Sequence, residues 1–378
     1  MPKMMLIHTV KLFLLLSMST LLAYCAKTTG TETDDSTPQP QDKPTAEPIA
    51  ESHTATEAIE AKEPLITHIY TADPSAHVFE GKLYIYPSHD QDKDASETHE
   101  GDQYDMVDYH VFSLEDLNSP IVDHGRILHI DDVPWVEKQM WAPDAAFKDD
   151  TYYFYFPAKD EEGIFRIGVA SSPSPTGPFT PQPEPIPGSF SIDPAVFVDD
   201  DGQAYMYFGG LWGGQLEKWQ TGAFDPDGAP PQGTEPALGP RVAKLADDMM
   251  SFDGPIQEIV ILNQAGEPLQ AKDRDQRFFE GAWLHKYEGT YYLSYSTGDT
   301  HYLVYATSDS PTGPFVFGGR ILNPVVGWTT HHSIVEFQGT WYLFYHDSSL
   351  SDGVSHKRCV KLAELHYNGD GSIQTINP

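Results

Sequence analysis

Along most of the chain, short apolar runs alternate with tight polar turns in an arrangement that occurs five times. Each copy has a polar or ionisable residue at its head, a short apolar run, a turn containing glycine or aspartate, and a strand with alternating aromatic residues. Period-two alternation on both sides of such a turn predicts a β-hairpin. The heads are Asp73, Asp144, Asp193, Glu280 and His331, and the turns contain Gly81, Asp150, Gly202, Gly289 and Gly339.

The repetition predicts how these hairpins assemble. Each head residue precedes its turn residue by six to nine positions, and the segment "SPTGPF" occurs twice, at 174–179 and 310–315. Repeats of roughly 50 residues with several strands each are typical of β-propellers. Five copies therefore predict an all-β fold, a five-bladed β-propeller that forms one domain over residues 65–378.

Two of the heads are followed by proline, at Asp73-Pro74 and Asp193-Pro194. A residue before proline is biased towards extended backbone, so we expect extended geometry at Asp193. A single Asp-Pro is most simply the start of a turn or strand. Its recurrence at the heads of two copies indicates a shared role for the two carboxylates.

The N-terminal residues predict export. Lys3 and Lys11 precede an apolar run over residues 12–23, which is too short to span a membrane and is typical of a signal peptide ending at residue 25. Cys25 has the position that is lipidated in bacterial lipoproteins, although Tyr24 stands where such signals usually carry a small residue. We expect a periplasmic, cell-surface or secreted protein, in contact with the membrane only through a lipid anchor.

The next segment, residues 26–64, is rich in Thr, Pro, Glu and Ala and has very few large apolar residues, which predicts a disordered linker. The net charge of −33 excludes general nucleic-acid binding, which requires clusters of Lys and Arg, and it disfavours a strongly anionic polymer as ligand. Cys25 and Cys359 are the only cysteines, so no structural disulfide is expected.

The heads of the five copies should converge, because the innermost strands of propeller blades begin around one axis. Carboxylates that share a pocket repel one another, which raises the pKa of some and leaves others ionised. Glycoside hydrolysis needs this separation: a carboxylic acid protonates the leaving oxygen and a carboxylate activates water.

The motifs in these copies resemble glycoside hydrolase family 43 from about residue 68 to the C-terminus. They occur in order as "ADPSAHVF", "WAPDAAF", "SIDPAVF", "FFEGAW" and "HHSIVEFQGTWYLFYH". The resemblance implies a five-bladed propeller that hydrolyses with inversion. It implies that Asp73 is the general base, that Glu280 is the general acid, and that Asp193 positions the acid and modulates its pKa.

The same resemblance suggests roles for other residues. Asp144 is either a substrate contact or a residue that orders the first blade, and Trp141 is either a wall of the sugar pocket or a core tryptophan. Arg358 resembles an arginine that reaches the substrate. His331, preferred over His332, resembles a histidine that faces Ca²⁺ in the axial channel, and we expect no organic cofactor.

These observations predict an exported, exo-acting β-xylosidase and/or α-L-arabinofuranosidase that acts on plant or algal polysaccharides or oligosaccharides. An exo-acting galactosidase or galactofuranosidase of the same fold is the alternative enzyme. A non-catalytic glycan-binding surface lipoprotein is the alternative from another class. The long connections at 88–110 and 209–278, which include Trp212, should shape the mouth of the pocket.

Overall fold

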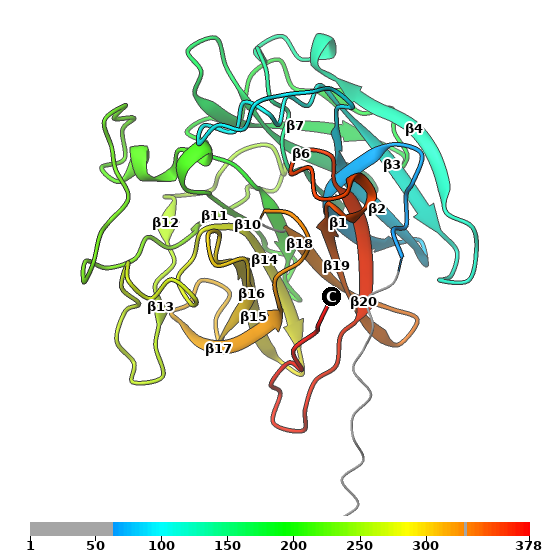
Figure 1. Cartoon of the computed structure of the whole chain (residues 1–378). Coiled ribbons are helices and arrows are strands. Elements are labelled where there is room, and N and C mark those ends of the chain that lie inside the picture. Colours follow the sequence, from blue (N-terminus) through cyan, green and yellow to red (C-terminus); the bar gives the residue numbers. More distant parts are fainter. Residues whose placement is uncertain (1–62, 329–330) are drawn as a thin grey trace, which may run out of the picture. The chain divides into compact units, whose positions relative to one another are not determined.

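The computed structural model describes residues 63–328 and 331–378. The predicted signal peptide and the predicted linker up to residue 62 lie outside the described residues. The described part is all-β, with strands in five sheets that are antiparallel except for one parallel pair, and a few short 3₁₀ helices (Figure 1). It contains no helix with the length and apolar character needed to cross a membrane.

Each sheet is one blade, and its strands follow one another in chain order. Blade 1 contains β1 (Tyr70–Phe79), β2 (Lys82–Asp90), β3 (Asp108–Leu114) and β4 (Val122–His129). Blade 2 contains β5 (Asp144–Lys148), β6 (Thr151–Lys159), β7 (Phe165–Ser172) and β8 (Thr180–Pro181). Blade 3 contains β9 (Ala195–Val198), β10 (Ala204–Phe208), β11 (Arg241–Lys244) and β12 (Gln257–Glu258).

The last two blades depart from four strands. Blade 4 contains β14 (Glu280–Tyr287), β15 (Thr290–Ser296), β16 (Leu303–Ser308) and β17 (Phe315–Leu322), and β13 (Ile261–Leu262) adds to β17 in parallel. Blade 5 contains β18 (His332–Phe337), β19 (Thr340–Asp347) and β20 (Cys359–Glu364). Five blades confirm the predicted propeller.

The hairpin turns have the geometry that their sequences predict. Four first hairpins have two-residue turns with positive φ at both central residues, which matches the right-handed twist of the strands. These pairs are Glu80 and Gly81, Asp149 and Asp150, Glu288 and Gly289, and Gln338 and Gly339. The hairpin of blade 3 has a longer turn, with Gly202 at φ 83°.

The ring closes between the last blade and the first. The innermost strands β1, β5, β9, β14 and β18 contact one another in sequence, and β18 contacts β1 (Figure 1). The segment before β1 and the start of β1 also join blade 5: the Leu65 N–H donates to the Val360 carbonyl, and the Thr71 N–H donates to the Arg358 carbonyl, both at 2.9 Å. Ile66, only 1% exposed, packs in the core between these blades.

A tyrosine occupies a fully buried position in the second strand of every blade: Tyr86, Tyr155, Tyr207, Tyr295 and Tyr345. Four of the five hydroxyls donate to backbone carbonyls at 2.6–2.9 Å, including Tyr86 to Pro175 and Tyr207 to Pro311. These bonds satisfy the polar end of a side chain whose ring fills the core. The aromatic alternation in the sequence thus supplies a buried tyrosine to the interior of every blade.

Candidate active site

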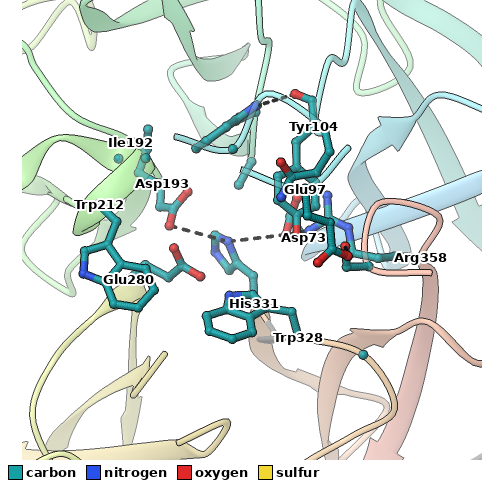
Figure 2. Close-up of a pocket in the computed structure, with 18 of the residues that line it drawn as sticks. Asp73, Glu97, Tyr104, Ile192, Asp193, Trp212, Glu280, Trp328, His331 and Arg358 are labelled. Carbon is teal, nitrogen blue, oxygen red and sulfur yellow. Dashed lines mark hydrogen bonds and ion pairs between the residues drawn. The ribbon is translucent and has the colours of Figure 1, made fainter. Parts of the chain in front are cut away.

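Four of the five heads border one cavity of about 670 Å³ (Figure 2). Asp73, Asp193, Glu280 and His331 line it, although they come from four blades. Its rim is formed by connections that include residues 97–106, 211–214 and 353–358. The cavity has the size of an ordinary small-molecule site.

Asp73 is a buried carboxylate that the surrounding groups keep ionised. Arg358 Nη1 donates to its Oδ1 at 3.0 Å, and the Ser88 hydroxyl donates to its Oδ2. Burial alone would raise the pKa of Asp73, but Arg358, His346, His331 and Ser88 lower this pKa to about 2. Asp73 is therefore ionised at neutral pH.

Arg358 is held in place by a second carboxylate. Its Nε and Nη2 atoms donate to Asp90 at 2.8 and 2.7 Å, and its guanidinium lies 4.8 Å from the centre of the Tyr104 ring. Burial would lower the pKa of Arg358, but Asp73 and Asp90 hold it above its usual value. This bidentate pair fixes the cation that faces Asp73.

Asp193 has left-handed backbone, with φ 59°, and Asp73 likewise has φ 49°. The expectation of extended geometry before Pro194 was therefore wrong. Positive φ is costly for residues other than glycine and occurs at functional sites where the surrounding structure enforces it. Here it turns the Asp193 carboxylate inward, where Oδ2 accepts the Gly281 N–H at 3.0 Å.

Glu280 is the carboxyl group of the cavity that is best suited to carry a proton. Burial and, to a smaller extent, the Asp73 charge raise the pKa of Glu280 to about 8, against the opposing effect of Arg358. Burial also raises the pKa of Asp193 well above its usual value, with Glu280 and Asp73 adding to the effect. Burial and neighbouring charges thus favour a protonated carboxyl group in this pair, while the Gly281 N–H stabilises the charged form of Asp193.

His331 lies between the carboxylates, with Nδ1 3.9 Å from both Asp73 Oδ1 and Asp193 Oδ2 (Figure 2). Burial lowers its pKa, so the imidazole is neutral at neutral pH. Gly281 has φ 67°, and a Cβ atom there would lie 3.3 Å from the His331 ring. The neighbouring His332 is buried elsewhere, with Nε2 2.6 Å from the Ser294 hydroxyl, so His331 is the inward member of the pair.

Aromatic side chains form walls of the cavity. Trp141 lines it, and its Nε1 donates to the Tyr104 carbonyl at 2.7 Å. A Cβ atom at Gly101 would lie only 2.6 Å from the Trp141 ring, so glycine is required for this close approach. Trp212 and Trp328 lie together on another wall, with ring centres 6.1 Å apart (Figure 2). Flat apolar faces of this kind pack against the C–H faces of sugars.

Asp144 is not among the residues that line the cavity. Its carboxylate is 1% exposed and binds three protein groups: the Ser75 hydroxyl, His77 Nε2 at 2.7 Å and the Val196 N–H at 2.5 Å. It thereby connects blades 1, 2 and 3. Asp144 therefore has the placement of a residue that orders the blades and not that of a substrate contact. It is buried, and both of its oxygens accept hydrogen bonds from protein groups.

Sequence reasoning missed several residues of the site. Asp90 and Ser88 fell within a segment that was predicted only to shape the mouth, yet they hold Arg358 and Asp73. His346, whose Nδ1 accepts the Asp73 N–H at 2.9 Å, was inside a quoted motif without an assigned role. One feature of the sequence could have indicated Ser88 and Asp90. Both lie at the end of β2, the alternating strand that pairs with the strand of Asp73.

Together, a five-bladed propeller and a cavity with one ionised and one protonated carboxyl group define a glycoside hydrolase. Residues 61–373 match the model of the family described as "Glycosyl hydrolases family 43". The chain belongs to this family, as its motifs indicated.

Curated relatives agree with this assignment. "Xylosidase/arabinosidase 43A" of Humicola insolens is 66% identical over 326 residues, which cover 83% of this chain and 99% of that protein. "Xylosidase/arabinosidase" of Bacteroides ovatus is 54% identical over 313 residues, which cover 82% of this chain and 96% of that protein.

Solved structures show the same fold. A β-xylosidase/α-arabinofuranosidase from a compost microbial metagenome, in complex with xylotriose and in a calcium-free form, is 62% identical with a TM-score of 0.83. The match covers 85% of this chain and 98% of that chain. A family 43 enzyme of Xanthomonas citri complexed with xylotriose is 55% identical with a TM-score of 0.81, and the match covers 85% and 94% of the two chains.

Proposed function

We propose that this glycoside hydrolase is an exo-acting, inverting β-xylosidase and/or α-L-arabinofuranosidase of plant or algal polysaccharides or oligosaccharides. The observation that carries the proposal is the convergence of Asp73 and Glu280 on one aromatic-walled cavity, where Arg358 contacts Asp73 and burial raises the pKa of Glu280. The names of the relatives and the xylotriose in two similar structures support pentose-containing substrates.

In this mechanism Glu280 donates its proton to the glycosidic oxygen as the bond to the anomeric carbon breaks. Asp73 accepts a proton from a water molecule, which attacks the anomeric carbon from the opposite face. Direct displacement by water inverts the anomeric configuration. The Asp73 charge helps to keep Glu280 protonated, we propose that the Asp193 carboxylate adds to this effect, and Arg358 holds Asp73 in position.

The residues around His331 fit a Ca²⁺ ion in the axial channel. His331 presents a neutral nitrogen near two carboxylates, and a hard cation prefers oxygen ligands, including water. We propose that His331 faces such an ion, with water completing its coordination. When bound, the ion would supply positive charge that stabilises the ionised carboxylates. His331 itself packs on Gly281 and separates Asp73 from Asp193.

We also propose that the protein is exported, on the basis of the basic residues and apolar run before Cys25. Whether lipid is attached to Cys25 can be measured by mass spectrometry of the protein purified from its own membrane fraction. A mass increase on the N-terminal peptide supports the anchor, and an unmodified cysteine contradicts it.

Hydrolysis of a panel of p-nitrophenyl pentosides and hexosides tests the proposed specificity. We expect the β-D-xyloside and the α-L-arabinofuranoside to be hydrolysed with the highest kcat/KM. A preference for galactosides or galactofuranosides would support the alternative enzyme, which one relative at 29% identity, a "Beta-D-galactofuranosidase" of Aspergillus niger, represents. Binding of sugars without turnover of any glycoside would support the glycan-binding alternative.

A further inference from the structure

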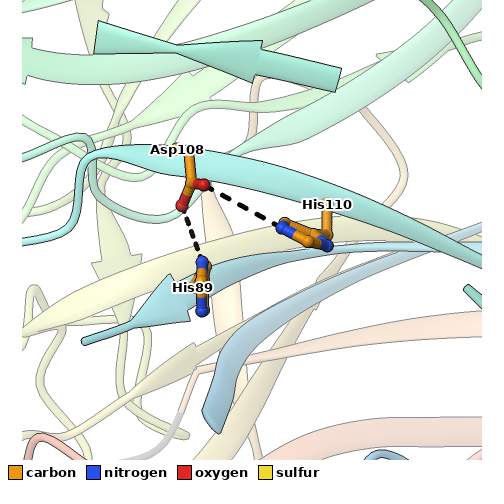
Figure 3. Close-up of side chains that lie close together, drawn as sticks. All are labelled: His89, Asp108 and His110. Atoms are coloured by element: carbon orange, nitrogen blue, oxygen red, sulfur yellow. Dashed lines mark hydrogen bonds and ion pairs between the residues drawn. The ribbon is translucent and has the colours of Figure 1, made fainter. Parts of the chain in front are cut away.

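A second group of ionisable side chains lies in blade 1, outside the catalytic cavity. It contains His89 on β2 and Asp108 and His110 on β3 (Figure 3). Each offers one ligand atom, and these atoms all lie within 4.8 Å of one another. The sequence contained no short Cys/His motif that predicts a nitrogen-ligand metal site, so this group arises only from the pairing of β2 with β3.

Strand register brings the three residues together. Ser88 pairs with Tyr109, which places His89 beside Asp108, and Asp108 and His110 alternate with the buried Tyr109 on β3. His89 Nδ1 lies 2.6 Å from Asp108 Oδ1, and His110 Nε2 lies 3.9 Å from Asp108 Oδ2. In Figure 3 the Asp108 carboxylate lies between the two rings and faces both of them.

We propose that His89, Asp108 and His110 form a binding site for a divalent transition-metal ion of the Zn²⁺ type. Two imidazoles and a carboxylate suit Zn²⁺, which binds such ligands at about 2.0–2.2 Å. The side chains are 12–20% exposed, so an ion can reach the site, and a water molecule would complete a tetrahedron.

A carboxylate lies near the second ring nitrogen of one of these histidines. A metal-binding histidine usually directs its second ring nitrogen at a carboxylate, which fixes the ring and its tautomer. His110 Nδ1 lies 3.6 Å from Asp123 Oδ1, slightly beyond hydrogen-bond length. Asp123 is itself held by His68 Nε2 at 2.8 Å and by the Gly125 N–H at 2.7 Å.

The position of the site indicates its consequence for the fold. Ser88 and Asp90, the neighbours of His89 on β2, point the other way and hold Asp73 and Arg358. An ion that links β2 to β3 therefore stabilises the strand end that supports the catalytic base. This is a site for nitrogen and oxygen ligands, separate from the channel of His331.

Isothermal titration of untagged, chelator-stripped protein with Zn²⁺, in buffer with excess Ca²⁺, tests the proposal. The Ca²⁺ occupies sites that prefer oxygen ligands, so nitrogen-ligand sites remain for Zn²⁺. We expect one tight site in the wild type and its loss in His89→Gln and in His110→Gln. Asp123→Asn should bind Zn²⁺ about 10- to 100-fold more weakly, because it removes the group that orients His110. His366→Gln, which changes a half-exposed histidine in another blade, should bind like the wild type.

Two further readouts keep the result independent of folding. The melting temperature of each stripped variant shows whether it is folded, and Zn²⁺ should raise this temperature in the wild type and in His366→Gln only. Co²⁺ in place of Zn²⁺ should give the visible absorption of a four-coordinate nitrogen and oxygen site. Equal Zn²⁺ affinity in the wild type and in folded His89→Gln and His110→Gln would overturn the proposal, as would absorption of six-coordinate Co²⁺ only.

Discussion

Asp73 and Glu280 are both buried carboxyl groups of the same cavity, yet their surroundings give them opposite protonation states. Asp73 contacts a guanidinium and a hydroxyl, whereas the Asp73 charge and burial act together on Glu280. The positive φ of Asp73 and Asp193 indicates that the backbone is strained to direct these carboxylates inward. The site thus assigns acid and base roles through environment rather than residue type.

Substitution of these two residues should separate their roles. Asp73→Ala should lower kcat/KM by at least about 10²- to 10⁴-fold on every substrate, because no other group activates the water. Glu280→Ala should cause a similar loss on xylo-oligosaccharides but a much smaller loss on aryl glycosides with good leaving groups, which need little protonation. Steady-state kinetics on both substrate classes measures this difference. Equal losses of Glu280→Ala on both classes would contradict its role as acid.

The pH dependence of kcat/KM should follow the two pKa values. Glu280 must be protonated, so activity should fall as the pH rises through about 8, and Asp73 stays ionised down to about pH 2. Asp193→Asn removes a negative charge beside Glu280, which makes loss of its proton easier and moves the alkaline limb to lower pH. An alkaline limb that Asp193→Asn leaves in place, or moves to higher pH, would argue against this coupling.

Part of this site was predictable from local sequence, and part was not. The strand heads Asp73, Asp193 and Glu280 stood out because each begins a repeated hairpin. Their partners Asp90 and His346 did not, because each lies at the end of another strand and meets the cavity only in the folded ring. Asp193 has left-handed backbone, whereas a residue before proline prefers extended backbone. Tertiary contacts such as the hydrogen bond from the Gly281 N–H outweigh this local preference.

At the scale of elements, blades are joined by buried polar contacts as well as by apolar packing. Asp144 on β5 accepts hydrogen bonds from β1 and from the Val196 N–H of β9. It therefore fixes the inner strands β1, β5 and β9 relative to one another. Asp73 lies on β1, and Asp193 lies just before β9.

Asp144→Ala should lower the free energy of unfolding, because the Val196 N–H and the Ser75 and His77 side chains lose their acceptor. A buried donor left without a partner costs roughly 1–3 kcal/mol. Denaturant unfolding measures the loss, and Asp247→Ala, at a fully exposed aspartate, serves as the control. KM of the folded variant should stay close to that of the wild type. A raised KM with unchanged stability would instead make Asp144 a substrate contact.

Elements differ in how far the sequence determined them. The two-residue turns of four hairpins were predictable because the conformation requires Gly, Asp or a similar residue locally. The start of β3 at Asp108 was hidden in a long polar segment, so the group around His89 could not be anticipated. The parallel pairing of β13 with β17 likewise depends on a contact between residues about 50 positions apart, such as Ile261 and Phe315.

At the scale of the whole molecule, β1 and the segment that precedes it close the ring against blade 5. Leu65 and Thr71 donate to the carbonyls of Val360 and Arg358, and Ile66 fills the core between blades 1 and 5. This closure also positions Arg358 against Asp73, so the integrity of the ring and of the site are linked.

Ile66→Ala should reduce the free energy of unfolding by about 2–5 kcal/mol, because it leaves a cavity in a fully buried position. Val122→Ala, at a half-exposed position on β4, should have little effect and controls for loss of a β-branched residue. Thermal or denaturant unfolding gives the comparison. Equal stability of the two variants would show that the segment before β1 does not hold the ring closed.

The configuration of the sugar first released tests the central claim most directly. Asp73 as base and Glu280 as acid require that water attacks the anomeric carbon directly, so each turnover inverts the configuration. Proton NMR during hydrolysis of a β-xyloside by the wild type should therefore show α-xylose first, with β-xylose appearing only later through mutarotation. Initial release of β-xylose would contradict the account, because it requires a carboxylate nucleophile and a covalent intermediate in place of the activated water.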